Sequence, residues 1–398
     1  MIWCKSKTDG KHIKYAESGW EKKEVFYLCM HPETRGVFFM DIKYMQRAIE
    51  LAKLGEGFTN PNPLVGAVIV KDGRIIGEGW HECYGGLHAE RNALKNATEP
   101  VVGADMYVTL EPCSHYGKQP PCCEAVADAD IKNVYIGSDD PNPLVAGKGI
   151  RYLKEHGINV VTGVLKDECD EISKIFFHYI THKTPYIIMK AAMSIDGKCA
   201  SYTGDSKWIS NELSREDTHR TRKRVAGIMV GINTVLADNP MLNCRLENPK
   251  NPVRIICDSK LKIPLDCEIV KTAKDIPTYV ATVSDDRSKE KLLADYGVKI
   301  IKTTGERVDL AELMKALGEL KIDSVLVEGG AELHASMLKA GLVNKLEVYI
   351  APKIIGGTDS KPIVGGKGVS FVRDAYMFKN PKITMLGEDI KIEYEKEE

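Results

Sequence analysis

The pattern of apolar and polar residues changes abruptly at Met40. Residues 1–39 contain two Trp, two Cys and scattered Lys and Glu, without a helical or alternating period. From Met40 onward, apolar residues recur at helical spacing over 44–52, and this helix should end near Gly55. Asp41 is a suitable N-cap for it. Residues 1–39 are therefore either a genuine extension or, as we prefer, upstream sequence attached by a misplaced start, with Met40 as the initiator.

The region that follows alternates between strands and helices. Two strands, over 64–70 and 74–79, flank an Asp72-Gly73 turn, which is a strong hairpin signal. The remaining pattern predicts strands over 106–110, 133–137 and 158–162, and helices over 88–96, 124–129, 150–156 and 166–180. This alternation predicts a mainly parallel, layered α/β unit.

A second α/β pattern begins after the linker-like segment Thr181–Pro185 (THKTP). It predicts strands over 186–193, 227–230, 253–257, 278–282, 298–301, 324–327 and 345–350, and helices over 212–223, 310–320 and 331–340. The predicted domains are therefore 40–184 and 185–398, with 1–39 unassigned.

Composition narrows the class of protein. A length of 398 residues allows two or three domains, and 43% hydrophobic with 28% charged residues is ordinary for a globular protein. The formal net charge of -1 provides no global positive field, so we expect no nucleic-acid partner. Eleven scattered cysteines argue against a disulfide scaffold, and no apolar stretch has the length of a membrane span. We expect a cytoplasmic protein without a membrane partner.

The sharpest chemical signal is His88-Ala89-Glu90 followed by Pro112-Cys113 and Pro120-Pro121-Cys122. A catalytic zinc takes three protein ligands and leaves one position for water, which His88, Cys113 and Cys122 would supply. Glu90 is placed to move protons, as in zinc nucleobase deaminases. Two alternatives stay open: Cys123 as the ligand in place of Cys122, and cysteines that are merely small buried apolar residues.

Several runs in this half resemble the bifunctional riboflavin-biosynthesis deaminase/reductase family. They are 60–68 (NPNPLVGAV), 88–90 (HAE), 109–122 (TLEPCSHYGKQPPC), 140–143 (DPNP) and 147–149 (GKG). The long loop between Cys113 and Cys122 is itself that family's pattern. The resemblance implies one Zn²⁺ per chain and hydrolytic removal of the 2-amino group of 2,5-diamino-6-(5-phosphoribosylamino)pyrimidin-4-one. It also implies substrate contacts from Asn62, His115, Lys118, Asp140 and Asn142, although Asn62 and Asn142 could instead serve turns beside proline.

The second half has no Gly-x-Gly-x-x-Gly fingerprint. Its own local signal is 325–330 (VLVEGG), a strand that runs into glycines and then a helix. Such a turn can present backbone amides to a phosphate, but it is often only a turn.

The same family also covers this half, through 190–197 (KAAMSIDG), 204–210 (GDSKWIS), 234–240 (TVLADNP), 256–259 (ICDS) and 327–330 (VEGG). The resemblance implies a fold similar to dihydrofolate reductase and an NADPH-dependent opening of the ribose to a ribityl chain. It implies NADPH contacts from Ala192, Trp208, Thr234, Asp238, Ser259, Gly330, Ala331, Glu332, Leu333, His334, Ala335 and Ser336. It implies substrate contacts from Lys190, Ser206, Arg222, Leu242, Arg245 and Glu328.

Each of these positions has a plainer interpretation. Arg222 and Arg245 suit a bidentate phosphate clamp but could form solvated surface pairs. Trp208 could be a core residue, and Asp238 could only cap a turn.

Taken with this resemblance, the sequence predicts a cytidine-deaminase-like α/β/α domain followed by a dihydrofolate-reductase-like α/β domain. The resemblance implies phosphoribosyl pyrimidine substrates, and we expect a homo-oligomer. Two other functions remain possible: a zinc deaminase of another base with an inactive second domain, and a binding protein that zinc only stabilises.

Overall fold

The computed structural model describes residues 13–16, 26–29, 40–117, 119–142 and 145–397. The chain forms two compact units that divide between Phe177 and His178. Each unit is described by itself below. No helix in the described part of the chain is long and apolar enough to span a bilayer.

A small antiparallel sheet precedes the first helix. It contains β1 (Ile13–Ala16), β2 (Phe26–Cys29) and β3 (Met40–Asp41). The sequence pattern predicted no strand here. Most of 1–39, the segment that we predicted to be attached by a misplaced start, lies outside the described residues.

The N-terminal unit is built on a five-stranded sheet in the order β5 (Arg74–Trp80), β4 (Gly66–Lys71), β6 (Asp105–Leu110), β7 (Asn133–Ser138) and β8 (Asn159–Thr162). Strands β6 to β8 are parallel, but β4 is antiparallel to both β5 and β6. The predicted hairpin and the predicted parallel strands after it are both present, but the antiparallel pairing of β4 with β6 was not predicted. The Asp72-Gly73 turn, with φ of 50° and 73°, is the left-handed pair that reverses the chain in two residues.

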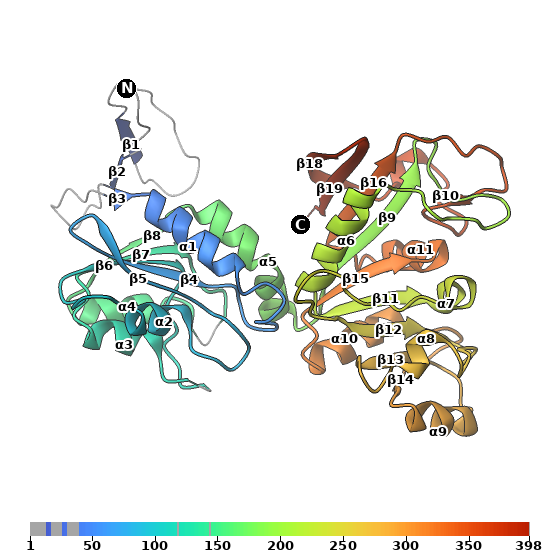
Figure 1. Ribbon diagram of the computed structural model, residues 1–398, viewed down its shortest axis with the longest axis horizontal. Helices are drawn as coiled ribbons and strands as arrows, with labels where there is room; N and C mark the ends of the chain where they lie inside the picture. Colours follow the sequence, from blue (N-terminus) through green and yellow to red (C-terminus); the bar gives the residue numbers. More distant parts are fainter. Residues whose placement is uncertain (1–12, 17–25, 30–39, 118, 143–144, 398) are drawn as a thin grey trace. The chain divides into compact units, whose positions relative to one another are not determined.

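Helices cover both faces of this sheet, which makes the predicted three-layer α/β/α arrangement (Figure 1). Helices α1 (Lys43–Lys53) and α5 (Lys166–His182) lie on one face. Helices α2 (Ala89–Lys95), α3 (Cys122–Asp128) and α4 (Lys148–Glu155) lie on the other. The N-cap of α1 is Ile42, one residue later than predicted, although the Asp41 carboxylate accepts the Lys43 N–H at 3.0 Å.

The C-terminal unit contains a nine-stranded sheet. Its order is β14 (Lys299–Lys302), β13 (Thr278–Thr282), β12 (Val253–Cys257), β11 (Gly227–Gly231), β15 (Ser324–Gly329), β9 (Tyr186–Ser194), β16 (Lys345–Ala351), β19 (Asp389–Lys396) and β18 (Phe378–Leu386). The strands from β14 to β16 are parallel, and β19 and β18 add antiparallel. A separate two-stranded ribbon pairs β10 (Lys198–Ala200) with β17 (Lys361–Pro362).

The helices of this unit pack on both faces of the sheet. The predicted ones are α6 (Glu212–Arg224), α10 (Leu310–Glu319) and α11 (Ala331–Lys339). The sequence pattern missed α7 (Ile232–Asp238), α8 (Glu268–Lys271), α9 (Arg287–Asp295), the 3₁₀ turn Val372–Asp374 and the β18–β19 hairpin. Most of these elements are short or expose most of their residues: α9 buries only Leu293, so it carries almost no apolar period.

Candidate active sites

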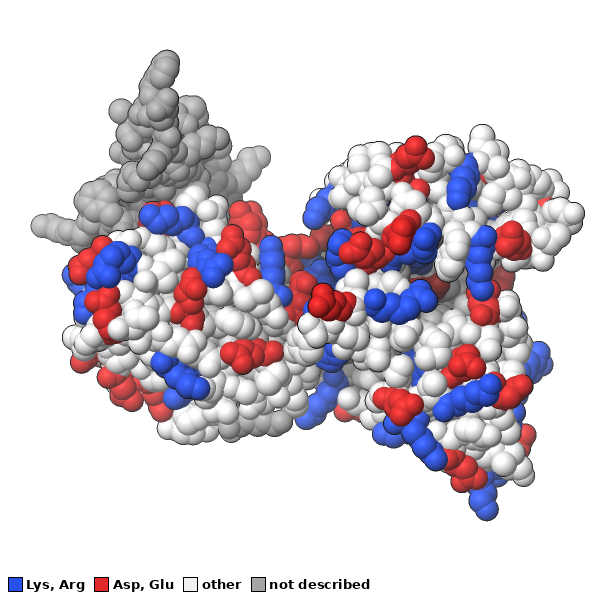
Figure 2. Space-filling view, in the orientation of Figure 1, with Lys and Arg blue, Asp and Glu red and all other residues white. Residues whose placement is uncertain are grey.

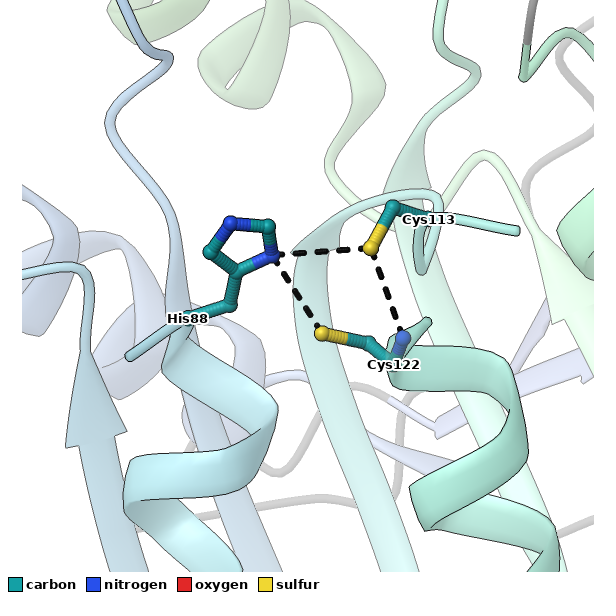
Figure 3. A group of neighbouring side chains, drawn as sticks. All are labelled: His88, Cys113 and Cys122. Carbon is teal, nitrogen blue, oxygen red and sulfur yellow. Dashed lines mark hydrogen bonds between the residues drawn. The ribbon is translucent and has the colours of Figure 1, made fainter. Parts of the chain in front are cut away.

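Three potential metal ligands meet where α2 and α3 begin (Figure 3). His88 is the N-cap of α2, Cys113 follows β6, and Cys122 is the first residue of α3. The Sγ atoms of Cys113 and Cys122 lie 3.5 Å and 3.4 Å from His88 Nδ1. The ligand atoms of all three residues lie within 4.8 Å of one another. The structure therefore brings together the three residues that the sequence predicted as ligands.

The donor set suits zinc. One imidazole and two thiols are the borderline-soft ligands that zinc prefers, and within the described residues this cluster has only three members, which leaves a position for water. The Cys122 N–H donates to Cys113 Sγ at 3.3 Å. Hydrogen bonds from Cys122 and His88 lower the pKa of the Cys113 thiol to about 4, so it readily becomes the thiolate that a metal needs.

Cys123, the rival ligand, points elsewhere. Its side chain is 1% exposed and belongs to the apolar core with Val126 and Leu153. The Cys122 sulfur, in contrast, is one of the three ligand atoms that lie within 4.8 Å of one another. The geometry therefore supports Cys122 over Cys123.

Glu90 lies on the first turn of α2, directly beyond His88, and is only 3% exposed. Burial, reinforced by the negative charge on Cys113, raises the pKa of its carboxyl group. A carboxyl group in this environment can both hold and release a proton. Helix α2 packs closely against β5 at Gly79, which is possible because glycine has no Cβ: a Cβ there would lie 2.3 Å from the Ala93 nitrogen.

Glu111 is a buried residue that sequence reasoning missed. Its Oε1 accepts the N–H groups of Gly149 and Ile150 at 3.0 and 3.2 Å, and its Oε2 accepts those of Gly147 and Asp140 at 3.0 and 3.5 Å. One carboxylate thus fixes the start of α4 and the loop before it to the strand end that precedes Cys113.

That loop carries two of the predicted substrate residues, Asp140 and Asn142. The Asn142 N–H donates to Asp140 Oδ1 at 2.8 Å, which is the turn chemistry considered as the alternative. Burial raises the pKa of Asp140 to about 6. Gly149, in the first turn of α4, packs directly against the Pro112 backbone, since a Cβ there would lie 2.0 Å from the Pro112 oxygen.

Asn62 has a second missed neighbour, His81. The Asn62 Nδ2 lies 3.1 Å from His81 Nε2, and His81 Nδ1 lies 3.0 Å from the Leu87 oxygen. Because the Asn62 amide nitrogen and the His81 Nδ1–H both donate, a neutral imidazole with its proton on Nδ1 satisfies the whole chain. Desolvation by burial lowers the pKa of His81, which favours that form. Of the other predicted contacts, His115 is exposed, and Lys118 lies outside the described residues.

In the C-terminal unit, the strand order changes direction between β11 and β15. Ligands of open α/β sheets bind outside the carboxyl ends of the strands at such a point. Here β15 ends at Gly329, Gly330 is the N-cap of α11, and the two glycines have φ of 155° and 52°. A Cβ on Gly330 would lie 3.5 Å from the Thr234 hydroxyl of α7. The glycine backbone after β15 and the first turn of α11 offer the N–H groups that suit a pyrophosphate.

The predicted NADPH residues come from several elements and loops of the C-terminal unit. Thr234 and Asp238 are four residues apart on α7, and Ala192 is in β9. Ser259 follows β12, and its hydroxyl accepts the Val308 N–H at 3.0 Å. Trp208 is 59% exposed, with the Arg215 guanidinium 4.7 Å from its ring, so it is not a core residue.

The residues of the segment 330–336, all predicted to contact NADPH, differ widely in burial. Leu333 packs into the core and His334 is buried, with Nδ1 2.8 Å from the Ile363 oxygen, whereas Gly330, Ala331 and Ala335 are half-buried. Glu332 and Ser336 are exposed, and Glu332 Oε1 accepts the Gly366 N–H at 3.0 Å. Leu333 and His334 are thus turned into the protein, and not every side chain of this segment is open to a cofactor.

The predicted substrate residues include a buried charged group. Arg222 donates through Nε and Nη2 to Glu328 at 2.6 and 2.7 Å, and through Nη1 to the Asn243 oxygen at 2.8 Å. The structure therefore differs from the expected pair of phosphate clamps, because Glu328 and Asn243 already occupy Arg222. The pair is not a surface pair either, with side chains only 14% and 9% exposed.

Lys190 lies beside this pair. Its pKa is lowered by burial, and its Nζ is 5.4 Å from the centre of the Tyr349 ring. Ser206 is half-buried and lies in the loop before Trp208. Leu242 is buried, whereas Arg245, three residues later, is exposed. The guanidinium of Arg245 is thus the accessible arginine of the site.

The two halves of the chain match two different family models. Residues 40–138 match the cytidine and deoxycytidylate deaminase zinc-binding region, and residues 185–392 match the RibD C-terminal domain. The riboflavin biosynthesis protein RibD of Actinobacillus pleuropneumoniae is 52% identical, over 89% of this chain and 95% of the relative. The RibD protein of Escherichia coli is 39% identical, over 88% and 98%.

Solved structures agree as well. A structure of Acinetobacter baumannii RibD matches with a TM-score of 0.82 and 36% identity, over 90% of this chain and 99% of that one. A Thermotoga maritima protein, described as a diaminohydroxyphosphoribosylaminopyrimidine deaminase and 5-amino-6-(5-phosphoribosylamino)uracil reductase, matches with a TM-score of 0.81 and 37% identity, over 89% and 98%.

Proposed function

The chain belongs to the RibD family of bifunctional deaminase/reductase enzymes of riboflavin biosynthesis, and from this membership we propose which reactions its two sites carry out. The N-terminal site hydrolyses the 2-amino group of 2,5-diamino-6-(5-phosphoribosylamino)pyrimidin-4-one to release ammonia. The C-terminal site then reduces the ribosyl group with NADPH to give 5-amino-6-(5-phosphoribitylamino)uracil. The observation that carries the first step is the convergence of His88, Cys113 and Cys122 beside the buried Glu90.

In the deaminase site, His88, Cys113 and Cys122 would hold a zinc ion. Zinc held there lowers the pKa of a bound water toward neutrality. Glu90 accepts the proton of the attacking water and passes it to the amino group, which leaves as ammonia. The burial of Glu90 suits this role, because its raised pKa makes the proton easy to hold between the two transfers. Asn62, oriented by His81, and the loop held by Glu111 would position the pyrimidine.

The zinc ligands can be tested by metal analysis. Replacing Cys113 or Cys122 with Ser should lower bound zinc from one ion per chain to a small fraction, because each change removes one of only three protein ligands. Cys123→Ser is the matched control and should keep a full complement. Loss of zinc from Cys123→Ser but not from Cys122→Ser would reverse the assignment. A fourth protein ligand, detected by X-ray absorption spectroscopy at the zinc edge, would instead favour a closed structural site.

In the reductase site, bound NADPH supplies a hydride. The chain's own contribution is placement: the glycines after β15 and the first turn of α11 receive the pyrophosphate. The flanking residues Ala192, Trp208 and Ser259 orient the two ends of the cofactor. Lys190 and the Arg222–Glu328 pair border the ribose, and Arg245 faces its phosphate. Positioning of this kind is the main requirement of hydride transfer.

Incubation of purified protein with the deaminated intermediate and NADPH tests this half. We expect NADPH oxidation and a product heavier by two hydrogen atoms in mass spectrometry. A protein that releases ammonia but oxidises neither NADPH nor NADH would instead be a deaminase with an inactive second domain.

We also propose that the chain forms a homo-oligomer. Strand β18 is the edge of the large sheet, yet Ile383 and Met385 on it are 65% and 60% exposed, and Phe371 and Met377 before it are 59% and 68% exposed. Such apolar side chains on an edge strand are usually covered by another surface.

The face drawn in Figure 2 intersperses acidic and basic side chains, which is in keeping with small-molecule substrates rather than nucleic acid.

A further inference from the structure

His219 is a buried imidazole of the C-terminal unit to which the reaction described above gives no role. It lies on α6 and is 8% exposed. Its neighbours are two arginines of the substrate site: Arg222, one turn further along α6, and Arg245. The electrostatic effects of Lys190 and Glu328 also reach it.

Two N–H groups of Arg245 face the His219 ring. The Arg245 backbone nitrogen lies 3.3 Å from Nδ1, and its side-chain Nε lies 3.1 Å from Nε2. An imidazolium ion accepts no hydrogen bond, and a neutral imidazole accepts at one nitrogen only. The ring can therefore hold Arg245 only in its neutral form, through one of these two donors. Desolvation, followed by the charges of Arg222 and Arg245, lowers the pKa of His219 to about 4 and so maintains that form.

The whole segment before Arg245 is fastened to the same helix. The Cys244 thiol donates to the His219 oxygen at 3.4 Å, and Arg222 Nη1 donates to the Asn243 oxygen at 2.8 Å. The outer end of the Arg245 side chain is different, because among the described residues no carboxylate pairs with it. An exposed guanidinium that is held at its inner nitrogen presents its outer nitrogens to an anion.

We propose that His219 is a positioning residue of the reductase site, which holds Arg245 so that its guanidinium receives the phosphate of the phosphoribosyl substrate. This inference rests on the proposed reductase function and names a residue that neither ligates NADPH nor reacts.

The kinetic test separates positioning from general structure. His219→Phe keeps a ring of similar size but removes both acceptors, and it should raise KM for the deaminated phosphoribosyl intermediate about tenfold, the size of one charge-assisted hydrogen bond. The value of kcat and the KM for NADPH should stay close to those of the unchanged protein. The matched control is Arg220→Gln, which alters the next residue of α6 on its exposed side.

Two conservative variants identify the donor that matters. The side-chain oxygen of His219→Asn replaces the Nδ1 acceptor, and that of His219→Gln replaces Nε2. Restoration by Gln would show that His219 holds the guanidinium, and restoration by Asn that it holds the backbone of Arg245. Restoration by neither variant would contradict an acceptor role.

Double substitution supplies a readout that a purely structural role would not give. If His219 acts through Arg245, then His219→Phe added to Arg245→Leu should raise KM no further. Additive effects on KM, or an equal loss of NADPH affinity, would overturn the proposal.

Calorimetric titration with ribose 5-phosphate, with ribose as the control, tests the phosphate contact without turnover. Ribose 5-phosphate should bind the unchanged protein and bind His219→Phe about tenfold more weakly. Equal affinities would refute the role of His219. Binding of this sugar phosphate without any NADPH oxidation would refute the proposed reductase function and leave the positioning role supported.

Discussion

Glu111→Gln tests how the deaminase site is held together. Each oxygen of the Glu111 carboxylate accepts two backbone N–H groups. A glutamine amide can keep only one of these oxygens, so its NH₂ group would face two N–H donors that then lose their acceptor. Two hydrogen bonds to a charged group, at about 1.5 kcal/mol each, give an expected loss of about 3 kcal/mol. This corresponds to a fall in Tm of about 9 °C for a domain of this size.

The assay is differential scanning calorimetry of the zinc-loaded full chain, in which the two units should give separate transitions. Only the transition of the N-terminal unit should shift. Glu124→Gln is the matched control, because Glu124 accepts one hydroxyl, that of Tyr116, and glutamine can accept it equally well. An unchanged Tm for Glu111→Gln, or an equal shift of both transitions, would refute the role assigned to Glu111.

Three further predictions concern the C-terminal half of the chain. Arg254→Met should destabilise the C-terminal unit by at least about 3 kcal/mol in urea unfolding, because the buried guanidinium donates to five neutral acceptors, and each of them would lose this donor. His178→Gln should flatten the pH dependence of stability: burial lowers the pKa of His178 to about 4, so the unfolded state binds its proton first and up to about 3 kcal/mol of stability is lost as the pH falls from about 6.5 to 4. A protein whose acid destabilisation is unchanged by that substitution would contradict the sign. Ile383→Glu with Met385→Glu should shift sedimentation velocity toward the monomer, whereas an unchanged sedimentation coefficient would contradict the interface proposed on β18.

The chemistry of the metal centre was accessible from sequence, because His, Glu and Cys in Pro-flanked positions have few other uses in that order. The residues that support it were not. Glu111, His81 and His219 act on partners that folding brings near, and most of these partners are backbone groups without any sequence signal. The pairing of Arg222 with Glu328 is of the same kind.

The architecture shows the same division. Amphipathic and fully apolar elements were predicted within a few residues, because their burial leaves a period in the sequence. Helix α9 and strand β18 expose most of their side chains and therefore leave none. In the five-stranded sheet, the two-residue turn explains why β4 and β5 are antiparallel. The antiparallel pairing of β4 with β6 depends instead on where β6 packs in the sheet, which its sequence does not indicate.

The central claim is that one chain carries two chemically separate sites, and Glu90→Gln tests it most directly. Both activities are measured on one zinc-analysed preparation: ammonia release from the diamino substrate, and NADPH oxidation with the deaminated intermediate. The account predicts a full zinc content, a loss of ammonia release by at least about 100-fold, and unchanged reduction. Retained ammonia release, or the loss of both activities in a folded, zinc-loaded protein, would contradict it.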